Sequence, residues 1–223
     1  MSNTSRSFNA LEANLSDHGL LIAYHNAGER RGIASDVTLR AAVVFLITSW
    51  EAYIEDITTE SLNTIINRLS DPSLLPNHLK KTISTEIKKD HHEHAAWKLA
   101  GGAWRQFLSD RWIEMTTKRN RSFNSPTPLE VDELLDQTLG VQNIREKWGT
   151  QACTSLKSLV ELRGCIVHRG KLPSTISVSN VETWIILIRS LALDVDIAVR
   201  RHLLKLTGSD FGDVEFKLPI DEL

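Results

Sequence analysis

The feature that most constrains the fold is one long helical segment in the first third of the chain. Ser35 or Asp36 can cap its start, and the periodic pattern continues to about Leu69, before Asp71 and Pro72. A continuous helix of this length measures on the order of 50 Å at 1.5 Å per residue. Because its middle is apolar almost all round, we expect it to be the central helix of the fold.

The rest of the chain repeats this character, with sparse glycines and prolines that cluster between long periodic segments. Gly101-Gly102 breaks one such segment, and residues 118–128 form a loop with turn residues. The sequence therefore predicts an all-α fold, a helical bundle with shorter helices and loops inserted before residue 151. The other expected helices cover Phe8 to about Ala27, the residues after Asn77 to about Lys89, 129–139, 151–169 and about 181–206. We expect residues 1–206 to form a single domain and 207–223 a tail or arm.

Composition excludes several classes of protein. The 223 residues are 41% hydrophobic and 24% charged, and the net charge of −2 provides no overall field for nucleic acid. The longest apolar run, residues 41–47, is far shorter than the roughly 20 residues that span a bilayer. Two cysteines and no secretory leader point to the cytoplasm. We expect no membrane association, and any polyanion must bind to a local patch.

One short motif places two residues with catalytic potential on a predicted helix. Arg163 and His168 lie five residues apart, which places them about 140° and about 7.5 Å apart on an ideal helix. Arginine can hold a phosphate through two hydrogen bonds, and histidine can exchange a proton near neutral pH. A metal-free cleavage of RNA needs both abilities. The plain alternative is a helix end whose cations oppose the dipole before the terminating Gly170.

The segment "RGCIVH" resembles the R-x4–6-H motif of the HEPN superfamily. Further segments resemble its RiboL-PSP-HEPN-like branch, in the right order over roughly residues 36–190: "VVFLITSWEAYIEDI" (43–57), "RSFNSPTPLEVDELL" (121–135) and "REKW" (145–148). The resemblance implies a HEPN-like bundle built on one long central helix. It also implies a metal-independent endoribonuclease without a cofactor, with Arg163 and His168 as the catalytic pair and a 2′,3′-cyclic phosphate as product.

The same resemblance implies a homodimer whose two motifs share one cleft, with RNA as substrate and an antitoxin or other regulatory protein as a further partner. The biological setting would be stress, phage defence or a toxin–antitoxin pair. Gly164 departs from the family, which usually has a polar residue, often asparagine, directly after the motif arginine. A non-catalytic dimeric module that binds RNA, a nucleotide or a protein therefore stays open, as does a purely structural helical adaptor.

Other residues are candidates for supporting roles. Glu51 lies between Trp50 and Tyr53 on the expected central helix, where it could orient Arg163 or His168 or lie on an exposed polar stripe. Loop cations could follow an RNA backbone or only be solvated; these are Arg169 and Lys171 beside the motif, and Lys118, Arg119 and Arg121 in a second cluster.

The run "DHHEH" (90–94) holds Asp90, His92 and His94, with Asp90 and His94 at the i, i+4 spacing that can bind zinc on a helix. No matching cysteine or histidine group occurs elsewhere, so we expect a polar turn and no metal site.

Overall fold

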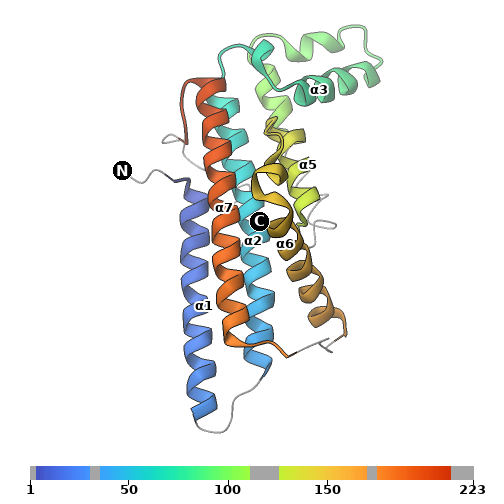
Figure 1. Ribbon diagram of the computed structural model, residues 1–223. Coiled ribbons are helices and arrows are strands. Elements are labelled where there is room, and N and C mark those ends of the chain that lie inside the picture. Colours follow the sequence, from blue (N-terminus) through green and yellow to red (C-terminus); the bar gives the residue numbers. More distant parts are fainter. Residues whose placement is uncertain (1–3, 31–35, 111–125, 170–174, 212–223) are drawn as a thin grey trace, which may run out of the picture. The chain divides into compact units, whose positions relative to one another are not determined.

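The structure, a computed structural model, describes residues 4–30, 36–110, 126–169 and 175–211. The described residues form α-helices and short 3-10 helices, with no strand among them, which confirms the all-α prediction (Figure 1). They divide into two compact units, each built from separate parts of the sequence. Unit 1 comprises Met1–Ile57, Ser125–Val131 and Asn143–Asp196; unit 2 comprises Thr58–Asn124, Asp132–Gln142 and Ile197–Leu223.

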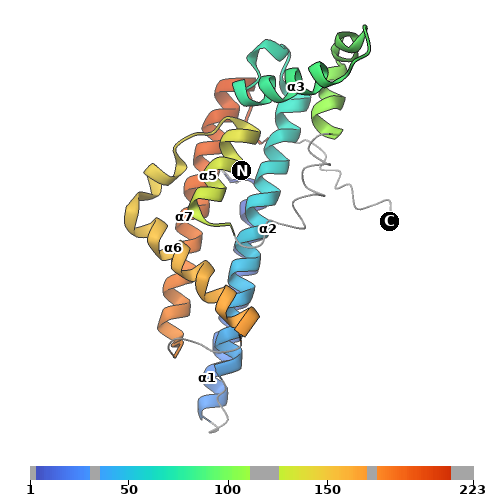
Figure 2. The same cartoon turned by 90° about the vertical axis from the view of Figure 1, so that its right-hand side faces the viewer.

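Unit 1 is a bundle of four helices: α1 (Arg6–Arg30), the first part of α2 (Asp36–Arg68), α6 (Ile144–Arg169) and most of α7 (Val178–Thr207). Side-chain contacts set the directions of the helices. Phe8 lies edge-on to Tyr53, and His18 stacks on Phe45, so α1 runs antiparallel to α2 (Figures 1 and 2).

The long helix α2 is central to unit 1, as predicted. The Tyr53 hydroxyl donates to the Ala192 carbonyl of α7 at 2.7 Å, and the Trp50 ring lies 6.0 Å from that of Trp148 on α6. The Trp50 indole also donates to the Pro126 carbonyl at 3.2 Å. These contacts join α2 to α1, α6 and α7 through residues that are almost fully buried.

The helix α2 is long and apolar enough to cross a membrane. The buried core helix of a helical bundle has the same length and composition, so this feature alone is weak evidence for a membrane span. Half of its most apolar stretch is buried inside the chain. The residues of α2 that face its neighbours in unit 1, among them Val43, Leu46 and Ile47, have no exposed surface. The expected absence of a membrane segment stays a prediction.

A buried polar contact in unit 1 joins the start of α1 to the middle of α7. The Asp196 carboxylate, 1% exposed, accepts hydrogen bonds from the Ser5 backbone amide and from its hydroxyl. Farther along the same pair of helices, Arg189 and Glu12 form an ion pair at 2.7 Å. The two contacts show that α1 and α7 run antiparallel.

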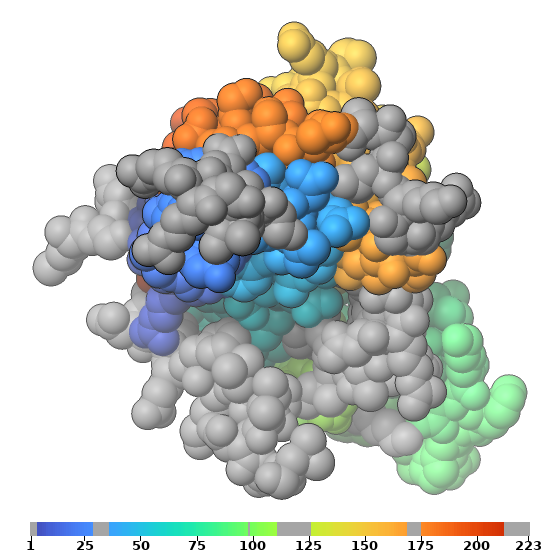
Figure 3. All heavy atoms as spheres, turned by 90° about the horizontal axis from the view of Figure 1, so that it is seen from below, coloured from blue at the N-terminus to red at the C-terminus, as the bar shows by residue number. Residues whose placement is uncertain are grey.

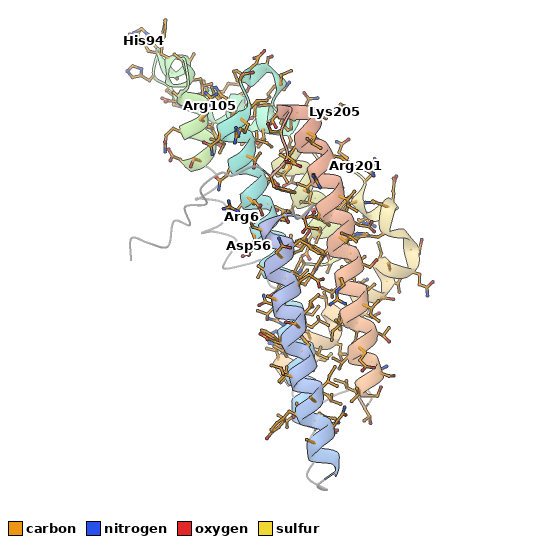
Figure 4. All side chains as sticks on the ribbon, turned by 90° about the vertical axis from the view of Figure 1, so that its left-hand side faces the viewer. Arg6, Asp56, His94, Arg105, Arg201 and Lys205 are labelled. Atoms are coloured by element: carbon orange, nitrogen blue, oxygen red, sulfur yellow. The ribbon has the colours of Figure 1, made fainter. Side chains whose placement is uncertain are left out.

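Unit 2 contains the last turns of α2 and α7, the 3-10 helices η1 (Pro72–Leu74) and η2 (Ala95–Leu99), α3 (Asn77–Lys89), helical residues 103–110 and most of α5 (Pro128–Leu139). Arg105, labelled in Figure 4, donates to the Ile66 and Leu69 carbonyls at 2.8 and 2.7 Å. These carbonyls at the end of α2 have no partner within the helix, so the guanidinium caps it.

Helix boundaries follow the local sequence chemistry. A reciprocal pair of bonds between Thr127 and Glu130 caps α5, and Ser177 and Asn180 cap α7 in the same way. The predicted start of α7 at residue 181 was therefore too late. Gly149, with φ 74° and ψ 167°, kinks α6, so the regular helix that carries the motif begins after it, as predicted within a residue.

Candidate functional site

The motif helix presents Arg163 and His168 on different sides. Leu156, Leu159 and Val160 are buried on α6, and Arg163, seven residues after Leu156, falls within about 20° of it around the helix. The arginine is half-buried, and its Nε atom is buried without a hydrogen-bond partner in the described part of the chain. His168 lies about 140° round the helix and is exposed.

The last turns of α6 lie beside the first turns of α2 at one end of unit 1. Figure 3 looks onto this end, with α6 in light orange at the right and the start of α2 in blue at the centre. Val167, next to His168, leaves 49% of its surface exposed. The motif is therefore at the end of the bundle, and the regular helix after Gly149 includes both motif residues.

Gly164, the departure from the family pattern, lies between the two motif residues in open space. A Cβ atom built on it would meet nothing within 4 Å among the described residues. A larger side chain at this position therefore meets no steric obstacle within the chain. Glycine also weakens the helix here, because its unfolded backbone has more freedom to lose.

Glu51 lies on α2 and is half-buried, with its Oε1 atom withdrawn from solvent. It is neither on a fully exposed stripe nor in the fully buried core. Its role in orienting Arg163 or His168 stays a prediction.

The predicted basic contacts fall largely outside the described structure. Arg169 is the last residue of α6, and its side chain is not described. Lys171, Lys118, Arg119 and Arg121 also lie outside the described residues. Their contact with RNA stays a prediction.

The polar run after α3 is a turn, as expected, and the helical Asp90 and His94 pair is not formed. The helix α3 ends at Lys89, and Asp90 accepts a bond from the His92 amide at 3.1 Å. Within the described ranges, no group of three or more histidine, cysteine or acidic side chains is placed to hold a metal ion.

A pocket on α6 was not predicted from the sequence. It has a volume of about 320 Å³ and is lined by Trp184 of α7 and by residues of α6, namely Ser158, Leu159, Glu161, Leu162 and Cys165. Of these α6 residues, Ser158, Glu161 and Cys165 lie on the side of the helix away from Arg163, whereas Leu159 lies within about 40° of it. Both cysteines of the chain, Cys153 and Cys165, are free and half-buried on this helix.

The described residues thus form a helical-bundle protein that carries an R-x4-H motif at the end of a bundle helix, the combination that typifies the HEPN superfamily. The RiboL-PSP-HEPN family model matches residues 8–200, and the chain belongs to this family. No curated protein and no solved structure matches the chain significantly.

Proposed function

We propose that this protein is a metal-independent endoribonuclease in which Arg163 and His168 act on the scissile phosphate. HEPN proteins are commonly ribonucleases, and family membership supports this reading. The observation that carries the proposal is the environment of Arg163. Its guanidinium is half-buried with an unpartnered Nε in the described chain, and a buried donor without an acceptor is costly. An RNA phosphate would supply the missing acceptor.

The chemistry follows from the two side chains. His168 removes the proton from a ribose 2′-hydroxyl, and the oxygen attacks the adjacent phosphorus while the bond to the 5′ oxygen breaks. The leaving 5′ oxygen takes a proton from water, and His168 returns its proton to solvent, so the products are a 2′,3′-cyclic phosphate and a 5′-hydroxyl. Arg163 holds the phosphate and stabilises the negative charge that builds on its oxygens.

A second copy of the chain would complete this site. Arg163 and His168 leave α6 in directions about 140° apart. The two side chains of one chain therefore do not both point toward a single phosphate beside the helix. In a homodimer, the arginine of one chain can meet the histidine of the other. The exposure of His168 and Val167 at the end of α6 fits such an arrangement. We place the active enzyme in the cytoplasm, where a regulatory protein such as an antitoxin would control it.

The first test is incubation of purified protein with mixed RNA in EDTA, comparing wild type with His168→Ala. Cleavage by wild type alone, ending in cyclic phosphates, is expected. His94→Ala is the matched control, because His94 is an exposed histidine outside the motif, and this variant should retain full activity. Cleavage that persists in His168→Ala would contradict the assignment of His168 as a catalytic residue.

A mixing experiment tests the shared cleft. Arg163→Ala and His168→Ala are each expected to be inactive alone, but a mixed dimer retains one arginine and one histidine from opposite chains. Partial recovery of cleavage after the two variants are exchanged is therefore expected. Wild-type activity without any recovery would contradict a cleft that pairs the residues across chains.

The second candidate is a dimeric module that binds RNA, a nucleotide or a protein without cutting it. Gly164 favours it, because the usual polar side chain after the motif arginine is missing. RNA binding in a gel-shift assay without cleavage, weakened by Arg163→Ala, would support this alternative over the enzyme.

A further inference from the structure

Unit 2 contains a second pocket, separate from the R-x4-H motif. It has a volume of about 450 Å³ and is lined by residues from α3, α5, α7 and the turns beside them, namely Pro76, Asn77, His78, Lys81, Asp136, Gly140, Gln142 and His202. Its size lies in the range of about 300–1,000 Å³ that is typical of small-molecule sites. The proposed nuclease mechanism uses none of these residues.

Backbone geometry shapes the floor of this pocket. α5 ends at Leu139, and just after it the Gly140 amide donates to the Asp136 carbonyl and the Val141 amide to that of Leu135. Gly140 has a φ of +78°, and a Cβ atom there would lie 2.7 Å from the Cβ of Pro76. Only glycine lets the end of α5 approach the start of α3 so closely.

The pocket has two kinds of polar group. The Lys81 ammonium and the His78 ring lie on the first turns of α3, which begins without a side-chain cap. Lys81 can bind a phosphate as a compact positive charge. Asp136 and Gln142 lie on another part of the wall, where the Gln142 amide donates to the Asp136 carboxylate at 2.9 Å. This carboxylate and amide can accept hydrogen bonds from the amino group of a nucleobase.

His202 completes the lining from α7. Burial is the main cause that lowers the pKa of its ring, with a smaller contribution from Lys205, while a bond to the Leu139 carbonyl opposes the shift. Its Nε2 atom is buried and has no hydrogen-bond partner among the described residues. Figure 4 shows Lys205 and Arg201 on successive turns of the same helix, and the Lys205 charge acts on His202.

We propose that this pocket binds a nucleoside monophosphate whose base carries an exocyclic amino group. Lys81 and His78 hold the phosphate, and Asp136 with Gln142 accepts the amino group of the base. The volume of the pocket favours a ligand of this size over a lone phosphate. A cationic pair on α3 and a hydrogen-bonding pair at and after the end of α5 supply the two kinds of partner that a mononucleotide needs.

Isothermal titration of the intact protein with CMP, UMP, cytidine and inorganic phosphate tests the inference. CMP should bind with a dissociation constant of about 1 mM or below, and UMP, cytidine and phosphate should each bind at least about tenfold more weakly. Lys81→Gln should weaken CMP binding by at least about tenfold, and Asp136→Asn should reduce the preference for CMP over UMP.

Lys88→Gln is the matched control, because Lys88 is an exposed lysine of α3 outside the pocket lining. It should bind CMP as wild type does. No binding of CMP, equal binding of phosphate, or equal loss in Lys81→Gln and Lys88→Gln would each overturn the inference. His168→Ala should also bind CMP normally, so failure of the nuclease proposal and failure of this one are distinguishable.

Discussion

His18 on α1 is a histidine whose protonation opposes the fold. Its side chain has no exposed surface, and its ring stacks on Phe45 with centroids 4.8 Å apart. The Asn14 carbonyl, which can only accept, lies 3.0 Å from Nδ1, so the proton of the neutral ring is on this nitrogen. Burial lowers the pKa of His18 from 6.5, despite this hydrogen bond.

The lowered pKa predicts a stability that depends on pH. In the range between the folded pKa and the unfolded value of 6.5, the unfolded chain binds more protons, so the free energy of unfolding falls as the pH falls through it. Above this range the contribution of His18 is fully present. Urea unfolding from about pH 8 to about pH 5 should show this fall, and His18→Phe, which keeps a ring against Phe45, should reduce it.

His202 in unit 2 has a pKa lowered in the same direction, so some pH dependence should remain in His18→Phe. Replacing the exposed His91 by glutamine controls for the loss of any histidine. A fall in stability of the same size in His18→Phe and in wild type would contradict the role of His18.

At the same scale, the sequence located the motif because Arg163 and His168 are close along the chain. It could not show which side of the helix packs, because that depends on the partners of α6. The pocket of unit 2 was not predicted at all. Its polar residues His78, Asp136 and His202 come from three helices far apart in sequence, and no local pattern joins them.

At the scale of the element, α6 carries two glycines with opposite roles. Gly149 has a φ and ψ that almost only glycine adopts, whereas Gly164 is helical and meets nothing within 4 Å. Gly149→Ala should lower the free energy of unfolding by about 1–3 kcal/mol. Gly164→Ala should raise it by up to about 1 kcal/mol, since alanine favours the helix.

Thermal or urea unfolding of the two variants checks this pair, and each serves as the control for the other on one helix. Equal effects of the same sign would contradict the kink at Gly149. Gly164→Asn, which restores the polar residue usual in the family, should fit without a clash and should not reduce any RNA cleavage.

Most helices could be predicted from the sequence because their ends carry local signals. The start of α3 at Asn77 follows Pro76, and the end of α5 precedes Gly140. The start of α7 was misplaced because Ser177 and Asn180 cap each other through two polar side chains in a serine-rich loop. The capping of α2 by Arg105 was not predictable, since the partners are 36 and 39 residues apart.

At the scale of the whole molecule, Ser5 ties the beginning of the chain to α7 within unit 1. Ser5→Ala removes a donor from the buried Asp196 carboxylate, which should cost about 1–3 kcal/mol of unfolding free energy. Ser16→Ala on the exposed side of α1 is the matched control and should have little effect. Equal unfolding midpoints for the two variants would show that the Ser5 contact contributes nothing.

The long central helix and the helical bundle around it followed from the pattern of residues 36–69, because a helix that is apolar almost all round must be surrounded. The division into two compact units could not be predicted in this way. Each unit joins distant parts of the chain, and the residues of α2, α5 and α7 are divided between the two units. Hydrophobic periodicity shows which face of a helix is buried, but it does not show that one part of a helix belongs to one unit and the rest to the other.

Both native thiols of this protein are on the helix that carries the motif. Cys153 and Cys165 are 12 residues apart on the regular part of α6, about 18 Å along its axis. Nitroxide labels attached there without any mutagenesis would report the orientation of α6 directly by electron paramagnetic resonance. If two chains form a dimer through their motifs, the spin–spin distances between the chains would show how the two α6 helices are arranged at the interface.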